Sequence, residues 1–259
     1  MTTVDEVRRA PAGTRVALFA SCANDVMFPQ TPKAVVTLLE RLGCEVVFPA
    51  GQTCCGQAFT NTSYFDEAVP VVRNYVRTFR DYDYIVGPSG SCVGSVRHQH
   101  EMLGRHAGDP GLAREAAAVA ARTYDISEFV VDVLGMTDVG AYFPHKVTYH
   151  PTCHSMRVAQ VGDKPMRLLQ AVRGITVLPL VDDDRCCGFG GTFAMKNPDI
   201  STAMAGDKAR HVADTGAEYL VAGDNLCLLN ISGVLNRQSA GVKPIHLAEI
   251  LASTEGERT

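Results

Sequence analysis

The 259-residue sequence contains no tryptophan, and aromatic residues make up only 7% of it. It also lacks an excess of basic residues, since 24 Lys and Arg stand against 28 Asp and Glu. This balance excludes the basic surface that nucleic-acid-binding proteins use to hold phosphates. No apolar run reaches the roughly eighteen residues of a membrane-spanning helix, because the longest uncharged stretch is interrupted by Pro49 and Gly51. We therefore expect no membrane span and no nucleic-acid partner.

The start of the chain resembles a secretory signal, because arginines precede the apolar stretch 16–20 and Cys22. That stretch is shorter than the roughly 7–15 apolar residues that a signal peptide requires. We expect it to be a strand and the protein to be cytoplasmic. The chain has nine cysteines. In a reducing compartment so many cysteines indicate metal or redox chemistry rather than disulfides.

The cysteines reveal an internal repeat. Val16 precedes Cys22 by the same spacing as Val147 precedes Cys153, and both halves continue with a Cys-Cys-Gly and a further single cysteine. The two sets stay in register to within a few positions, which indicates a duplication. The first set is Cys22, Cys54, Cys55 and Cys92, and the second set is Cys153, Cys186, Cys187 and Cys227. Cys44 belongs to neither set, and we expect it to be an ordinary buried thiol.

Short apolar runs alternate with longer amphipathic ones in each half, which predicts an α/β fold of two pseudo-repeated lobes with mostly parallel sheets and helical crossovers. The predicted strands are 16–20, 45–48 and 84–87, then 147–150, 175–178 and 219–222. The predicted helices are 31–42 and 65–80, then 165–172 and 198–213. We expect lobes at 1–134 and 145–259 with a linker at 135–144, and an extra helix within an insertion at 104–123.

This arrangement places the cysteines where parallel sheets bind ligands. Cys22 and Cys92 follow the carboxyl ends of predicted strands, and Cys54-Cys55 follows a third strand through a short loop. Ligands of open parallel sheets bind beyond those strand ends. We therefore expect four sulfur atoms to meet in each lobe.

Four thiolates suit either an iron–sulfur cluster or a tetrahedral zinc ion. Gly56 and Gly188, each directly after a cysteine pair, let loop amides approach and hydrogen-bond the sulfurs. Adjacent cysteines form only strained disulfides, so each pair is better suited to supplying two ligands. The sequence thus predicts one or two clusters, most simply [4Fe–4S], with zinc in one lobe as the alternative.

Several histidines are open to two interpretations. His150 and His154 flank Cys153 and could act on the metal centre, or could bond the backbone instead. They also permit a thiol enzyme with Cys153 as nucleophile, although a single nucleophile would not require the duplicated cysteines. His246 is expected to cap a helix. His98 and His100 are expected on an exposed helix face.

Longer motifs surround the cysteines: Gln52-Thr-Cys54-Cys55-Gly56-Gln57, His150-Pro-Thr-Cys153-His154 and Cys186-Cys187-Gly188-Phe-Gly-Gly191. With these motifs the chain resembles, from about Val16 to Leu251, the duplicated cysteine-rich CCG family. That family includes iron–sulfur subunits of L-lactate oxidising systems, glycolate oxidase and glycerol-3-phosphate dehydrogenase, and the B subunit of heterodisulfide reductase. The chain is most similar to the subunit of a three-component L-lactate oxidising system.

The resemblance implies that the eight paired and single cysteines hold iron–sulfur clusters that relay electrons when L-lactate becomes pyruvate. It implies a non-catalytic or co-catalytic subunit that works with a ferredoxin-type iron–sulfur subunit and a third small subunit. A glycolate oxidase-like or heterodisulfide reductase-like complex, or a zinc-binding structural subunit, is the alternative. Heterodisulfide reductase B subunits have further cysteines where this chain has Ser95 and Asn230, which argues against a noncubane cluster here. Ferredoxin-type cysteine runs are absent from this sequence, so the electron route would continue on a partner.

Overall fold

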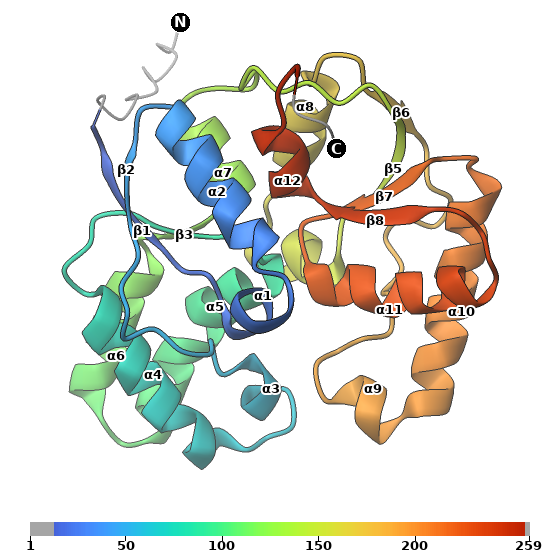
Figure 1. Ribbon diagram of the computed structural model, residues 1–259. Helices are drawn as coiled ribbons and strands as arrows, with labels where there is room; N and C mark the ends of the chain where they lie inside the picture. The colour runs from blue at the N-terminus through green and yellow to red at the C-terminus, as the bar shows by residue number, and fades with distance from the viewer. Residues whose placement is uncertain (1–12, 257–259) are drawn as a thin grey trace, which may run out of the picture.

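The computed structural model describes residues 13–256, which form two α/β lobes side by side (Figure 1). Each lobe is built on a four-stranded, entirely parallel sheet, with strand orders β2-β1-β3-β4 and β6-β5-β7-β8. The first sheet contains β1 (Arg15–Leu18), β2 (Glu45–Val47), β3 (Ile85–Gly87) and β4 (Thr123–Asp125). The second sheet contains β5 (Lys146–His150), β6 (Thr176–Leu178), β7 (Tyr219–Ala222) and β8 (Lys243–His246). The α/β prediction is confirmed.

The last strand of each sheet was not predicted from the sequence. β4 reads Thr-Tyr-Asp and β8 reads Lys-Pro-Ile-His, so neither contains an apolar run. Both strands lie at a sheet edge beside a buried central strand, β3 or β7. Pairing with that neighbour stabilises them as strands in spite of their composition.

Apart from α6 and η1, each helix of the first lobe has a counterpart in the second, in the same order. Those of the first lobe are α1 (Cys22–Met27), α2 (Gln30–Arg41), α3 (Gln57–Thr60), α4 (Phe65–Phe79), α5 (Gly90–His106), α6 (Pro110–Ala120), α7 (Ile126–Glu128) and the π-helix η1 (Phe129–Val133). Those of the second lobe are the π-helix η2 (Ser155–Ala159), α8 (Lys164–Gln170), α9 (Phe193–Lys196), α10 (Pro198–Asp214), α11 (Asn225–Arg237) and α12 (Leu247–Ala252). The four predicted helices are present.

The expected insertion helix is α6, which packs closely on α5. A Cβ atom added to Gly104 of α5 would lie 2.6 Å from the backbone nitrogen of Ala113 in α6. The close approach of the two helices therefore depends on the missing side chain.

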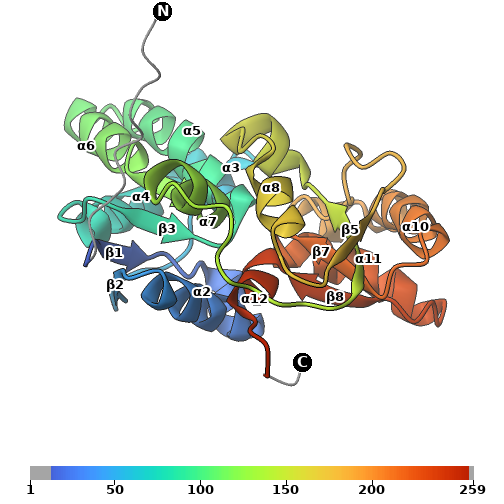
Figure 2. The same cartoon turned by 90° about the horizontal axis from the view of Figure 1, so that it is seen from above.

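One hydrophobic cluster is shared by the two lobes, and each lobe also has a cluster of its own. Helix α2 of the first lobe packs against α12 of the second, and α7 of the first contacts α8 of the second (Figure 2). Helices α2 and α8 are equivalent in the two lobes, and so are α7 and α12. The two contacts are therefore the same contact made twice, as expected for a duplicated chain. Leu38 of α2, Leu168 of α8 and Ile250 of α12 are fully buried in this single cluster. The side chain of Arg41 also donates to the carbonyl oxygens of Leu251 and Ala252 at the end of α12.

Within residues 13–256, no helix is both long and apolar enough to cross a membrane.

Candidate metal centres

The carboxyl ends of the strands bring the predicted cysteines to the boundary between the lobes. Cys22 begins α1 shortly after β1, and Cys92 lies in the first turn of α5 after β3. The second lobe repeats this placement with Cys153 before η2 and Cys227 in the first turn of α11. We call Cys22, Cys54, Cys55 and Cys92 the first-lobe cysteine site, and Cys153, Cys186, Cys187 and Cys227 the second-lobe cysteine site.

The helices that carry Cys92 and Cys227 meet at their N-terminal caps. Ser89 accepts a hydrogen bond from the backbone nitrogen of Cys92, and Asp224 accepts one from that of Leu226. The Ser89 hydroxyl also donates to the Asp224 carboxylate at 3.2 Å. This contact between equivalent residues fixes the two cysteine sites relative to one another.

The sulfur atoms of the second-lobe cysteine site lie in contact. The Sγ atoms of Cys153 and Cys186 are 3.8 Å apart, and those of Cys187 and Cys227 are 3.0 Å apart. All nine cysteines are free thiols. The backbone nitrogen of Gly188 donates to the Cys186 sulfur at 3.4 Å. Gly188 has φ +86°, and a Cβ atom there would lie 2.8 Å from the carbonyl oxygen of Ser201, so the loop requires glycine.

The first-lobe cysteine site repeats these features. The backbone nitrogen of Gly56 donates to the Cys54 sulfur at 3.3 Å, and Gly56 also has a positive φ. Cys54 interacts with the thiols of Cys22 and Cys55, and Cys55 interacts with Cys92. The structure therefore brings together all four predicted residues in each lobe.

In each site one thiol ionises more readily than the two thiols that hydrogen-bond to it. Hydrogen bonds from Cys22 and Cys55 lower the pKa of Cys54 to about 2, and those from Cys153 and Cys187 lower the pKa of Cys186 to about 2. Hydrogen bonding to that thiolate, together with burial, raises the pKa of each of these neighbouring thiols. Like charges in contact disfavour further ionisation. Bound metal ions would remove this penalty, so the donor set fits zinc or an iron–sulfur cluster held by four thiolates.

His150 distinguishes the second-lobe site from the first. It is fully buried at the end of β5, and neither of its ring nitrogens has a hydrogen-bond partner. A ring nitrogen lies within 4.8 Å of the sulfurs of Cys187 and Cys227. Burial and the Lys208 ammonium lower the pKa of His150 to about 3, so the ring is neutral. The repeat places Phe19, also fully buried, at the equivalent position.

The prediction for His100 was wrong. Its side chain is fully buried, and its Nε2 lies 2.8 Å from the carbonyl oxygen of Cys55. The error arose because α4 and α6 cover this part of α5, and Tyr75 of α4 stacks edge-on against the ring. His98 is exposed as expected.

The second lobe holds the equivalent carbonyl with a different residue. Asn230 Nδ2 donates to the carbonyl oxygen of Cys187 at 2.8 Å. Sequence reasoning treated Asn230 only as a missing cysteine and did not assign it this contact. Asn230 lies one helical turn after Cys227, and this spacing is the sequence signal that could have predicted the contact.

The remaining predicted residues have clear places. His154 Nδ1 lies 3.5 Å from the Cys153 sulfur, but the pKa of Cys153 is raised by its hydrogen bond to Cys186 and by burial. A protonated thiol is a poor nucleophile, so this geometry does not favour the thiol-enzyme interpretation. His246 caps α12 as predicted, accepting a hydrogen bond from the Ala248 nitrogen at 3.1 Å. Cys44 is buried in the shared core.

A pocket between the lobes connects the two sites. It is lined by Cys92 of the first-lobe site and by all four cysteines of the second-lobe site. Asn24, Gln57 and Asp224 contribute polar groups to its wall. A separate cavity of about 170 Å³ opens at Cys22 and Cys54 on the first lobe. The second-lobe site thus opens into the space between the lobes, whereas the first-lobe site reaches that space through Cys92 alone.

Comparison with known proteins agrees with this geometry. The model of the cysteine-rich domain CCG matches the chain twice, at residues 16–97 and 147–232. The chain is 47% identical over 237 residues to lactate utilization protein A of Oceanobacillus iheyensis, a match that covers 92% of this chain and 96% of that protein. It is 43% identical over 239 residues to lactate utilization protein A of Bacillus subtilis, covering 92% and 99% respectively.

Among solved structures, a hypothetical protein from Helicobacter pylori has the same fold, with a TM-score of 0.66 at 12% identity. The match covers 97% of this chain and 51% of that one. Two matched domains, duplicated cysteine sites and relatives over nearly the whole length lead to one assignment: the chain belongs to the cysteine-rich CCG domain family.

Proposed function

We propose that this chain is an iron–sulfur electron-transfer subunit that takes part in the oxidation of L-lactate to pyruvate. The observation that carries the proposal is the gathering of four thiols at the strand ends of each lobe. The names of the relatives support lactate as the substrate of the system. Four thiolates per lobe suit one [4Fe–4S] cluster each.

The chain's own contribution would be to hold and shield the clusters, which supply one-electron chemistry when bound. Backbone N–H groups of Gly56 and Gly188 donate to the paired sulfurs and offset negative charge. His100 and Asn230 fix the backbone of the second cysteine in each pair. Such hydrogen bonds and burial are the means by which a protein sets the potential of a cluster.

The electrons would leave through partners. A ferredoxin-type iron–sulfur subunit and a third small subunit of the lactate system are the partners that we propose, in the cytoplasm. The cavity at Cys22 and Cys54 supports an exchange route on the first lobe, because Cys22 is exposed there. Short distances between cofactors favour electron exchange, so an exposed cysteine edge is a suitable contact point.

Two alternatives follow from the same donor set. A zinc ion in one lobe would make that lobe structural. A glycolate oxidase-like or heterodisulfide reductase-like complex would use the same lobes with another substrate. The positions of the additional cysteines in heterodisulfide reductase are occupied here by Ser95, bonded to Gln99, and by Asn230, bonded to the Cys187 carbonyl. These contacts favour four thiolates per site.

The test is anaerobic purification followed by iron, zinc and acid-labile sulfide analysis. We expect iron and sulfide in comparable amounts, with an electron paramagnetic resonance signal after reduction. Zinc without sulfide would overturn the proposal. Reduction of the bound iron by L-lactate only when the partner subunits are added would support the electron-relay role, whereas reduction by glycolate in preference would favour the alternative complex.

A further inference from the structure

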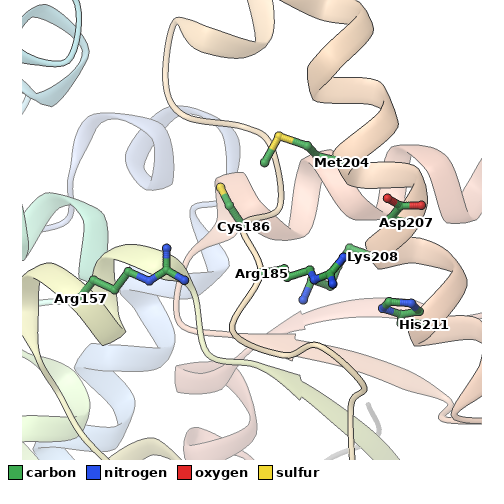
Figure 3. A pocket seen from close by; sticks show the side chains of 7 residues that line it. All are labelled: Arg157, Arg185, Cys186, Met204, Asp207, Lys208 and His211. Carbon is green, nitrogen blue, oxygen red and sulfur yellow. The ribbon is translucent and has the colours of Figure 1, made fainter.

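A pocket on the outer side of the second-lobe cysteine site lies outside the proposed electron path. It has a volume of about 320 Å³ and reaches the Cys186 side chain. Helix α10 forms one wall with Met204, Asp207, Lys208 and His211, which lie on one face of the helix (Figure 3). Arg157 from η2 and Arg185, next to Cys186, complete it.

The two arginines are available to bind an anion. Arg185 pairs with Asp182 at 3.1 Å and Arg157 with Asp184 at 4.0 Å, and all four side chains are substantially exposed. Exposed ion pairs of this kind contribute little to stability. Both arginines can therefore exchange these carboxylates for that of a ligand, although Arg157 also donates to the backbone carbonyl oxygen of Asp184 at 3.0 Å. Guanidinium groups hold carboxylates with two hydrogen bonds.

Lys208 has a different role, because it positions the loop that carries Cys186. It is almost fully buried, and its ammonium group donates to the carbonyl oxygens of Asp182 and Asp183. These bonds fix the segment that ends in Arg185 and Cys186. One cation thus holds the wall, and the two arginines line the pocket on either side of the Cys186 segment (Figure 3).

The equivalent cavity of the first lobe, at Cys22 and Cys54, has no arginine among the residues that line it. The repeat places Val26 where the second lobe has Arg157, and Thr53 where it has Arg185. Val26 and Thr53 both line the cavity at Cys22 and Cys54. The two arginine positions of the second lobe are thus uncharged residues in the first, where Asp25 is the charged residue that lines the cavity.

We propose that the pocket at Cys186 binds a small 2-hydroxy carboxylic acid. Arg157 and Arg185 would hold the carboxylate, Asp207 and His211 offer partners for a hydroxyl group, and Met204 provides an apolar contact for a short carbon chain. The choice of L-lactate as the natural ligand rests on the proposed function. The pocket would place that acid directly beside the second-lobe cysteine site and leave the first-lobe site free of substrate.

The test is isothermal titration calorimetry of the anaerobically purified full chain with L-lactate. Arg157→Val and Arg185→Thr introduce the residues of the first lobe. Each should weaken binding by about 10- to 100-fold, as expected for loss of a hydrogen bond between charged groups. Arg167→Val removes an exposed, ion-paired arginine of the same lobe that does not line the pocket, and this variant should bind L-lactate as the unchanged protein does.

Further ligands define the chemical class. Propionate, which lacks the hydroxyl group, should bind more weakly than L-lactate. Inorganic phosphate binding as tightly as L-lactate would overturn the assignment to hydroxy acids, and so would lactate affinity that is unchanged in both arginine variants. Iron content is measured on the same samples. Iron without lactate binding would refute this pocket alone, whereas lactate binding without iron or sulfide would refute the proposed cluster function alone.

Discussion

The two lobes have the same four cysteines on the same elements, yet their surroundings differ. Beside the paired cysteines, the first lobe has Phe19 where the second has His150, and both are fully buried. At the outer cavity, the first lobe has Val26 where the second has Arg157. The duplication has preserved the positions of the cysteines, whereas the residues around them differ. Sites with the same four cysteines therefore have different surroundings.

The strongest test of this comparison is to remove one buried cysteine from each lobe. Cys55→Ser and Cys187→Ser should each abolish metal binding in their own lobe, because a neutral hydroxyl is a poor substitute for a thiolate. If both lobes hold clusters, each variant should retain about half of the iron and sulfide. Cys44→Ala, outside both sites, should retain all of it. Loss of all iron in Cys187→Ser alone would mean that the lobes are not independent sites.

Replacing His150 with the residue of the other lobe tests the second difference. His150→Phe should remove any nitrogen coupling from the second-lobe centre, since a ring nitrogen lies within 4.8 Å of two of its sulfurs. Electron–nuclear double resonance on protein labelled with ¹⁵N-histidine measures that coupling. His246→Asn, which changes a buried histidine used as a helix cap, serves as the control. An unchanged spectrum in His150→Phe would show that His150 does not interact with the second-lobe centre.

The helix caps Asp125 of α7 and His246 of α12 occupy equivalent positions and should respond oppositely to acid. Burial raises the pKa of Asp125 to about 6 and lowers that of His246 to about 4. Below about pH 6.5 His246 is protonated in the unfolded chain but not yet in the folded chain. The free energy of unfolding therefore decreases as the pH falls toward 4. Asp125 is protonated in the folded chain at a higher pH than in the unfolded chain. Its effect is therefore to increase the free energy of unfolding as the pH falls below about 6.

Urea unfolding at about pH 7 and about pH 5 measures both effects, which amount to ~1.4 kcal/mol per pH unit for each group. Asparagine can cap a helix without titrating. His246→Asn should therefore lose less stability on acidification than the unchanged protein, and Asp125→Asn should lose more. Parallel curves for the two variants would contradict the assignment.

The smallest expected effect concerns the helix insertion, which the second lobe lacks. Gly104→Ala should destabilise the protein by about 1–3 kcal/mol, because the new methyl group would overlap the backbone of α6. Gly233→Ala in α11 has open space around it and should stabilise by about 0.5–1 kcal/mol. Thermal unfolding of the two variants gives the comparison. Equal shifts of the melting temperature would show that α6 does not pack closely on α5.

The sequence predicted most of the sheet because buried parallel strands are continuous apolar runs, as in β1 and β7. It failed at β4 and β8, whose conformation depends on a neighbouring strand. It also failed at His100, because no local pattern shows that α4 and α6 cover that residue. The arginine pocket was not predicted either. Arg157 and Arg185 are distant in sequence from α10 and meet it only through the fold.

The repeated spacing of the cysteines by itself determined the duplication, and the alternation of apolar and amphipathic runs determined the α/β class. Together they determined the eight residues that converge, because strand ends of a parallel sheet necessarily share one edge. The tertiary structure decided which charges and rings surround them. Burial of His150, the meeting of Ser89 with Asp224 and the pairing of α2 with α12 all join segments far apart in the chain. Such contacts arise from packing of whole elements, which local sequence patterns do not encode.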